Sequence, residues 1–158
     1  MAFKVVLLGL SHKTAPVELR ERLALEEPAV ETLLGGFRRQ PGLRELAYIG
    51  TCNRVELLGV AAADADARTA LTQLLCEAAA VPLDAFAPCL YYLEEGDAVA
   101  HVFLVAASLD SMVVGETEVL GQLKSAYRLA QQNASLGPVL HALFQRAFRV
   151  AKELHTLG

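Results

Sequence analysis

Hydrophobic and polar positions follow two patterns along the chain, one typical of strands and one typical of helices. Both patterns occur in the first part of the chain, and only the helical pattern occurs in the last part. Short apolar runs bounded by turn residues indicate buried strands. The predicted strands cover 3–10, 43–50, 55–60 and 89–93. Apolar residues that recur at helical spacing predict amphipathic helices. The predicted helices cover 16–25, 27–38, 65–79, 97–106, 119–130 and 138–154.

The order of these elements predicts the fold class. Strands mixed with helices come first and helices alone come last, which is typical of an α+β protein. We expect a small, mostly antiparallel sheet with crossing helices, followed by a helical subdomain. The sheet-containing subdomain is placed at 1–94 and the helical subdomain at 95–158, within one domain. The last helix reaches the final residue without a terminal capping sequence, so we expect the chain to be part of a longer protein.

Length and composition support a globular domain. The chain has 158 residues, of which 54% are hydrophobic and 20% are charged. This is the size of one domain with a sizeable core. No apolar run reaches the roughly 18 residues that a membrane span needs. Lys4 lies inside the opening apolar run rather than before it, which favours a buried strand over a signal peptide. We therefore expect a cytoplasmic protein that does not associate with membranes.

Cysteines, charge and glycine patterns exclude several classes of function. The three cysteines, Cys52, Cys76 and Cys89, are odd in number and accompany no export signal, which argues against a disulfide framework. No Cys/His ligand spacing occurs, so we expect no metal site. The net charge of −4 argues against a general nucleic-acid binder. The segment Gly9–Thr14 follows a predicted strand, but neither GxGxxG nor a Walker A loop is present in it.

The tetrapeptide Thr51-Cys52-Asn53-Arg54 is the strongest candidate for chemistry. Cys76 and Cys89 have apolar neighbours, where cysteine is usually an inert hydrophobe. Cys52 instead lies in a polar connection between two predicted strands. In an extended chain Cys52 and Arg54 point to the same side, and a nearby guanidinium favours the nucleophilic thiolate. The alternative is a turn cysteine beside a surface arginine.

Two further regions hold candidate residues. His101 lies at the edge of the apolar face of a predicted helix, where it is either a packed or solvated side chain or an acid–base group close to Cys52. The loop 108–117 mixes hydroxyls, carboxylates and a glycine around an apolar centre. It is either a helix connection with capping residues or a partly buried functional loop.

Four ordered segments together resemble the glutamyl-tRNA reductase family, over nearly the whole chain. The segments are Gly9–Glu21, Thr51–Glu56, His101–Gln122 and Leu140–Lys152. The resemblance implies an NADPH-dependent enzyme that makes glutamate-1-semialdehyde in the first step of five-carbon tetrapyrrole (porphyrin) biosynthesis. Enzymes of this family have a catalytic domain, an NADPH-binding domain and a helical dimerisation domain. This chain resembles the first, so NADPH and the homodimer contacts are expected in domains absent from it. No metal is implied.

The resemblance also implies residue roles. By position, Cys52 is the nucleophile that attacks the ester of glutamyl-tRNA to give a thioester, and His101 is a general acid–base or ester-positioning residue. The positions that align with substrate binding are Thr51, Asn53, Arg54, Ser111, Glu116, Thr117, Glu118 and Gln122. The planar guanidinium of Arg54 suits the side-chain carboxylate of the glutamyl group. This chain departs from the family pattern at Gly50, Leu58 and Glu118.

Two alternatives belong to other classes of function. One is a stand-alone thiol acyl hydrolase or transferase, in which water or another acceptor resolves the thioester. The other is a non-catalytic tRNA-binding or regulatory module, which the acidic net charge disfavours. Independence from NADPH would favour the first, and unchanged activity of Cys52→Ala would favour the second.

Overall fold

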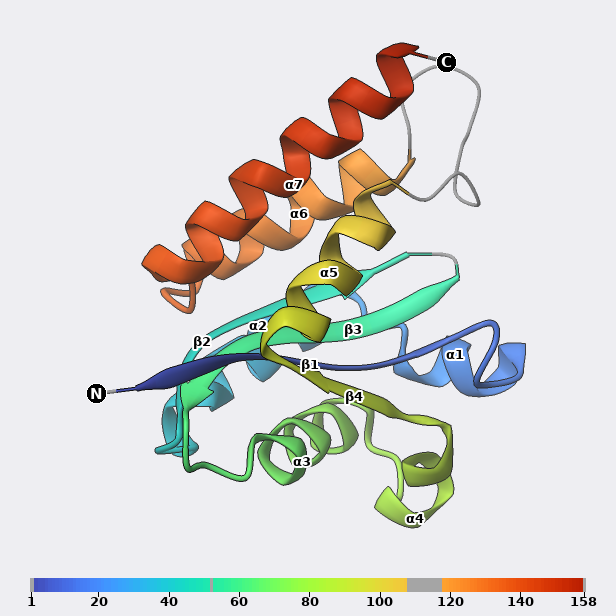
Figure 1. The fold of residues 1–158 in the computed structure, drawn as a ribbon. Helices are drawn as coiled ribbons and strands as arrows, with labels where there is room; N and C mark the ends of the chain where they lie inside the picture. Colours follow the sequence, from blue (N-terminus) through green and yellow to red (C-terminus); the bar gives the residue numbers. More distant parts are fainter. Residues whose placement is uncertain (1, 52, 108–117, 158) are drawn as a thin grey trace.

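The computed structural model describes residues 2–51, 53–107 and 118–157, and the side chains of Glu118 and of 154–157 are excepted. Cys52, Ser111, Glu116 and Thr117 therefore lie outside the described residues. Within them, the strands form one sheet in the order β2-β3-β1-β4 (Figure 1). The strands are β1 (Phe3–Ser11), β2 (Leu43–Gly50), β3 (Arg54–Ala62) and β4 (Tyr91–Glu94).

All the strand pairs described are antiparallel. The central strands β3 and β1 are neighbours in the sheet, although 42 residues separate their closest ends in the chain. The pairing sets Gly9 of β1 opposite Glu56 of β3 on one side and opposite Tyr91 of β4 on the other. This row of residues across three strands determines the geometry of the candidate site.

Helices cover both faces of the sheet. They are α1 (Val17–Leu23), α2 (Glu27–Gly36), α3 (Ala67–Ala79), α4 (Leu83–Phe86), α5 (Glu95–Ala106), α6 (Glu118–Gln132) and α7 (Pro138–Leu157), with short 3₁₀ turns at η1 (Phe37–Arg39) and η2 (Ala87–Cys89). Figure 1 shows α5, α6 and α7 on one side of the sheet and α3 and α4 on the other.

Most predicted boundaries lie within two residues of those observed, and two shifted starts and one unpredicted helix have local reasons. The last strand begins at Tyr91 rather than Cys89, because Pro88 directs the preceding residues into a 3₁₀ turn. Helix α5 begins at Glu95, so Asp97 lies in its first turn and does not cap it. The short helix α4 follows Pro82 and was not predicted.

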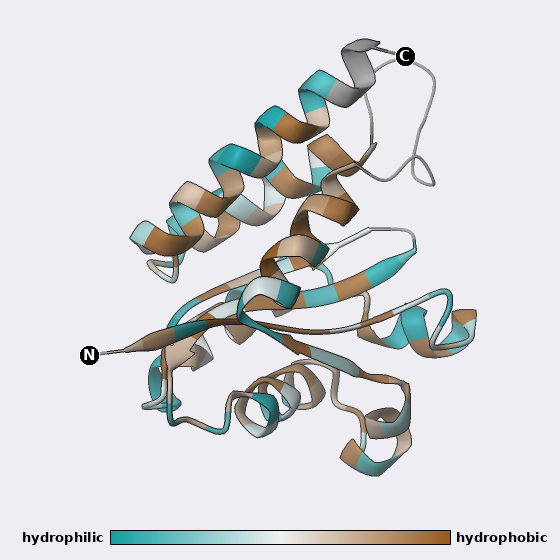
Figure 2. Cartoon of the chain, in the orientation of Figure 1, coloured by the Kyte–Doolittle hydropathy of each residue, from teal (hydrophilic) through white to brown (hydrophobic). Residues whose placement is uncertain are grey.

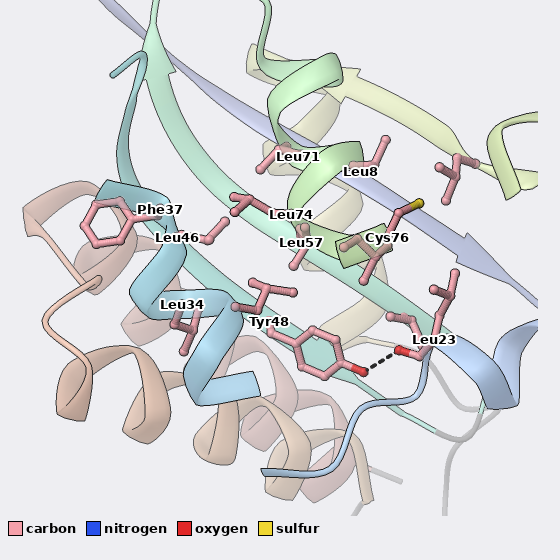
Figure 3. Close-up of a cluster of buried hydrophobic side chains, with 14 of the residues drawn as sticks. Leu8, Leu23, Leu34, Phe37, Leu46, Tyr48, Leu57, Leu71, Leu74 and Cys76 are labelled. Atoms are coloured by element: carbon pink, nitrogen blue, oxygen red, sulfur yellow. Dashed lines mark hydrogen bonds between the residues drawn. The ribbon is translucent and has the colours of Figure 1, made fainter. Parts of the chain in front are cut away.

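Two hydrophobic clusters lie on opposite faces of the sheet, because successive side chains of a strand point to opposite sides. Leu8 and Leu57 belong to the first cluster, with Leu23 of α1, Leu34 of α2 and Leu71 of α3 (Figure 3). Each fully buried leucine contributes about 1.5–3 kcal/mol relative to an exposed one. This cluster fixes the helices that flank the β2–β3 hairpin.

The second cluster joins the sheet to the last three helices. Leu7 and Leu58 pack there against Val102 of α5, Leu123 of α6 and Phe144 of α7. Figure 2 shows hydrophilic and hydrophobic residues alternating along α7, as expected for a helix with one buried face. The fold is therefore α+β with an antiparallel sheet, as the order of elements predicted.

Within the described ranges, no single helix is both long and apolar enough to cross a membrane. Only α3 taken together with Leu83–Cys89, across a bend of 109°, passes on length and composition.

Candidate active site

The Thr51–Arg54 motif closes the hairpin between β2 and β3. The backbone N–H of Thr51 donates to the carbonyl of Arg54 at 2.9 Å. Thr51 Oγ1 accepts from the backbone N–H groups of Asn53 at 3.2 Å and Arg54 at 3.1 Å. A hydroxyl bonded to its own backbone in this way stabilises a tight turn.

A second loop, 11–14, supports this turn. The N–H of His12 donates to the carbonyl of Asn53 at 2.9 Å. The loop is itself held by the Ser11 N–H, which donates to Thr14 Oγ1 at 2.9 Å, and by the Lys13 N–H, which donates to Ser11 Oγ at 3.2 Å. The first and second segments of the family resemblance are therefore in contact in space.

Glu56 connects Arg54 to His101. Its side chain is only 1% exposed and points to the face of the sheet that α5 covers. Glu56 Oε2 is hydrogen-bonded to Nε2 of His101, and Nη1 of Arg54 lies 4.0 Å from the same oxygen. A carboxylate oxygen accepts, so Nε2 of His101 is the donor. The side chains of Arg54 and His101 keep 14% and 17% of their surface exposed, so both stay accessible.

Tyr91 completes this cluster from the other side of β1. Its hydroxyl donates to Glu56 Oε2 at 2.5 Å, and its ring lies 5.4 Å from the His101 ring at an angle of 55°. Burial, followed by the negative charge of Glu56, raises the pKa of the Tyr91 phenol far above its ordinary value, with Arg54 acting in the opposite direction. Tyr91 therefore stays protonated and acts as a donor to Glu56.

A cleft lies beside the hairpin turn, between the end of β2 and the helices α2 and α6. It has a volume of about 370 Å³, and Thr51 of the turn and Gln122 of α6 both line it. The apolar part of its wall includes Leu25, Val30 and Leu129. This volume lies at the low end of the range of small-molecule sites. The wall mixes apolar and polar residues, and it includes Glu27 and Arg128, which form an ion pair at 3.6 Å.

The structure thus brings the predicted residues together in two groups. Arg54 and His101 meet through Glu56, while Thr51 and Gln122 share the cleft, and Asn53 lies in the turn between the two groups. His101 and Arg54 do not line the cleft. The side chain of Glu118, like Cys52, Ser111, Glu116 and Thr117, lies outside the described residues.

Glu56 and Tyr91 were not predicted as site residues. A signal for Glu56 existed, because a single carboxylate interrupts the apolar run Val55–Val60, and a buried charge needs partners. Tyr91 gave no comparable signal, because an aromatic residue in a short strand is ordinary. Only the strand register places its hydroxyl beside Glu56.

Neither a metal site nor a Rossmann-type dinucleotide site is found among the described residues. No group of three or more His, Cys, Asp or Glu side chains among them is placed to hold a metal ion. Dinucleotide sites of the Rossmann type need parallel strands joined by crossover helices and a glycine-rich turn. The antiparallel strands and the Gly9–Thr14 loop do not fit such a site.

Comparisons with known proteins agree with the resemblance. Residues 8–157 match the model of the family described as "Glutamyl-tRNAGlu reductase, N-terminal domain". A glutamyl-tRNA reductase of Syntrophus aciditrophicus is 41% identical over 154 residues, which cover 96% of this chain and 36% of that protein. The solved structure of a glutamyl-tRNA reductase from Methanopyrus kandleri has a TM-score of 0.73 and 31% identity, over 96% of this chain and 34% of that one.

The sheet, its helical layers and the hairpin site define an α+β domain. The chain belongs to the family of glutamyl-tRNA reductase N-terminal domains. It spans about a third of the length of the relatives that it matches.

Proposed function

We propose that this chain is the part of a glutamyl-tRNA reductase that captures the glutamyl group of charged tRNA on Cys52. The single observation that supports this best is the contact of His101 and Arg54 with the same oxygen of Glu56. Arg54 lies two positions after Cys52 in the chain, and we propose that His101 of α5 reaches the sulfur of Cys52 from this cluster.

The proposed reaction is an acyl transfer. The sulfur of Cys52 attacks the carbonyl carbon of the ester that joins glutamate to the tRNA 3′ end. A carbon–sulfur bond forms, the bond to the ribose oxygen breaks, and the tRNA leaves with a free hydroxyl. His101 takes the proton of the thiol and returns it to the departing oxygen, so that neither charged species builds up.

Substrate recognition is proposed for both groups of residues. Arg54 can bind the side-chain carboxylate of the glutamyl group through two parallel hydrogen bonds. The cleft beside Thr51 and Gln122 is large enough for an amino-acid side chain and opens next to the turn. Asn53, Ser111, Glu116, Thr117 and Glu118 are proposed to complete the pocket.

The reduction of the thioester to glutamate-1-semialdehyde is proposed for the complete enzyme, with NADPH as the hydride donor. Because the described residues do not fit a dinucleotide site, no part of that step is assigned to them. A homodimer formed through a further domain likewise stays a prediction. Covalent capture by sulfur makes chemical sense before reduction, because it divides one difficult step into two easier ones.

The experiment is covalent capture of label. Folded chain is mixed with tRNA that carries radiolabelled glutamate, quenched in acid, and assayed for label on protein that hydroxylamine releases. We expect label on the wild type and on Cys89→Ser, a half-buried cysteine outside the turn motif, and none in a thioester on Cys52→Ser.

Each outcome separates the competing functions. Label on Cys52→Ser equal to that of the wild type would contradict Cys52 as the point of attachment, whereas folded wild type that retains glutamyl-tRNA without any covalent label would favour a binding module. Label that disappears at the same rate with and without NADPH in the complete enzyme would favour an acyl hydrolase. Label that NADPH converts to an aldehyde supports the reductase.

A further inference from the structure

We propose that Tyr91 and Gly9 are positioning residues for the proposed acyl transfer: Tyr91 reaches across Gly9 to anchor Glu56, and Glu56 in turn sets which nitrogen of His101 faces the substrate. This inference rests on the proposed function for its catalytic meaning, but the arrangement itself is independent of it.

The strand register brings Gly9, Glu56 and Tyr91 together. Gly9 of β1 is paired with Glu56 on one side and with Tyr91 on the other, so the three residues form one row across β3, β1 and β4. Tyr91 and Glu56 are 35 residues apart in sequence and have β1 between them, yet their side chains meet at 2.5 Å.

Position 9 has no space for a side chain. A Cβ on Gly9 would lie 2.7 Å from Glu56 Cγ, 2.7 Å from the carbonyl oxygen of Val55 and 3.1 Å from the Tyr91 hydroxyl. The first two distances are shorter than any ordinary carbon contact, and the Val55 oxygen belongs to backbone that cannot move aside. Glycine is therefore required here by close approach, and the open space above it is where Tyr91 and Glu56 join.

The bond to Glu56 sets the tautomer of the His101 imidazole. Because Nε2 of His101 donates to the buried carboxylate, a neutral His101 carries its proton on Nε2 and leaves the lone pair on Nδ1. In the proposed reaction, Nδ1 is then the nitrogen that accepts the proton of the thiol and passes it to the departing oxygen. A carboxylate that orients a catalytic histidine acts in this way in other enzymes.

The hydroxyl of Tyr91 fixes the carboxylate of Glu56. Burial raises the pKa of Tyr91 and keeps its hydroxyl protonated, so the hydroxyl donates a hydrogen bond to Glu56. Without this hydroxyl, the Glu56 carboxylate would lose one of the two hydrogen bonds at Oε2 and could rotate away from His101. The ring of Tyr91, which lies against the His101 ring, would remain in Tyr91→Phe.

The experiment compares Tyr91→Phe and Gly9→Ala with Tyr92→Phe. Tyr92 is the matched control, because its hydroxyl bonds only the exposed Glu94, at 2.6 Å, among the contacts described for it. Nitrogen-15 NMR of histidine-labelled chain reports the tautomer of His101, and single-turnover transfer of labelled glutamate reports the rate and the half-saturating concentration of glutamyl-tRNA.

We expect His101 of the wild type and of Tyr92→Phe to be predominantly the Nε2–H tautomer. In Tyr91→Phe and Gly9→Ala the signals should move toward a mixture of tautomers. The single-turnover rate should fall about tenfold, which is part of the 10²–10⁴ that a positioned acid–base group contributes, with half-saturation unchanged.

An unchanged tautomer and rate in a folded Tyr91→Phe would overturn the proposal. A rate that falls in equal measure in Tyr92→Phe would also contradict it, because the effect would then be structural. Failure of the proposed function looks different: the wild type would take up no label, while the tautomer shift of Tyr91→Phe would still be seen.

Discussion

The carboxylate of Glu45 ends against the backbone of Gly137, 92 residues later in the chain, and Oε1 accepts the Gly137 N–H at 2.9 Å. The same carboxylate accepts the N–H groups of Val139 at 3.2 Å and Leu140 at 2.8 Å. Glu45 is 5% exposed and belongs to β2, so this strand caps the first turn of α7. The first-turn N–H groups of a helix have no partner within the helix, which explains why a buried carboxylate is tolerated here.

Gly137→Ala should destabilise the protein by about 1–3 kcal/mol, a typical cost of forced displacement in a packed site. An added Cβ would lie 2.5 Å from Glu45 Cδ, and the carboxylate cannot move without losing its hydrogen bonds to α7. Gly35→Ala is the control, because a Cβ there meets nothing within 4 Å and position 35 is helical. That change should stabilise by about 1 kcal/mol. Urea unfolding of both variants is the measurement, and equal effects would contradict the close-packed cap.

Tyr48→Phe should cost about 1–3 kcal/mol, because two backbone groups lose their partner. The Tyr48 hydroxyl donates to the carbonyl of Leu23 at 2.9 Å and accepts the N–H of Leu25 at 2.8 Å, which joins α1 to the sheet (Figure 3). Tyr92→Phe, at an exposed hydroxyl, should change the free energy of unfolding by less than about 0.5 kcal/mol. A loss in Tyr48→Phe no larger than in Tyr92→Phe would show that the hydroxyl does not connect these segments.

The same tyrosine predicts alkaline sensitivity. Burial, opposed by the Leu25 N–H, raises the pKa of Tyr48 from 10.0 to about 12. The unfolded chain then releases this proton at a lower pH than the folded chain, so stability is complete below the unfolded pKa and falls as pH rises through the folded one. Unfolding free energies measured between these two values should decline in the wild type more steeply than in Tyr48→Phe. Parallel curves would contradict the assignment.

Acid sensitivity is predicted at the start of α3. The side chain of Asp66 accepts from the Thr69 hydroxyl at 2.7 Å and the Thr69 N–H at 3.2 Å, and these bonds lower its pKa. A lowered folded pKa means that the stabilisation is present above the unfolded pKa and is lost as pH falls through the folded one. Asp66→Ala should therefore lower the melting temperature at neutral pH and remove part of the decline in acid. Asp64→Ala, an exposed turn residue nearby, should do neither.

His101→Asn should slow single-turnover transfer of glutamate to protein by about 10²–10⁴, because asparagine cannot carry a proton between the thiol and the leaving oxygen. His141→Asn is the control, since His141 lies on the exposed side of α7 and bonds Tyr127 at 2.9 Å. Rates within twofold of each other for the two variants would remove His101 from the reaction, whatever the role of Cys52.

The family assignment and most of the elements could be predicted from the sequence. The helices α6 and α7 were clear because their apolar positions repeat at helical spacing over many residues, which is a local property. The hairpin at Thr51–Arg54 was also local, since it connects two apolar runs that are adjacent in the chain. The shared side of Cys52 and Arg54 stays a prediction, because Cys52 lies outside the described residues.

Other features depended on contacts between distant parts of the chain. The sequence could not show that His101 contacts Glu56, 45 positions away, and its acid–base role stays a prediction. Thr51 and Gln122 line one cleft only because α6 packs against the sheet next to the hairpin. No pattern within either segment encodes that arrangement.

The sequence by itself determined which segments are strands and helices, that the core is large, and which family the chain belongs to, because periodicity and ordered motifs are read along the chain. Tertiary structure alone decided that Glu56 joins Arg54, His101 and Tyr91, and that Glu45 caps α7. The reason is that a carboxylate in an apolar run has an energetic need for partners, but strand register and helix packing determine which partners it meets.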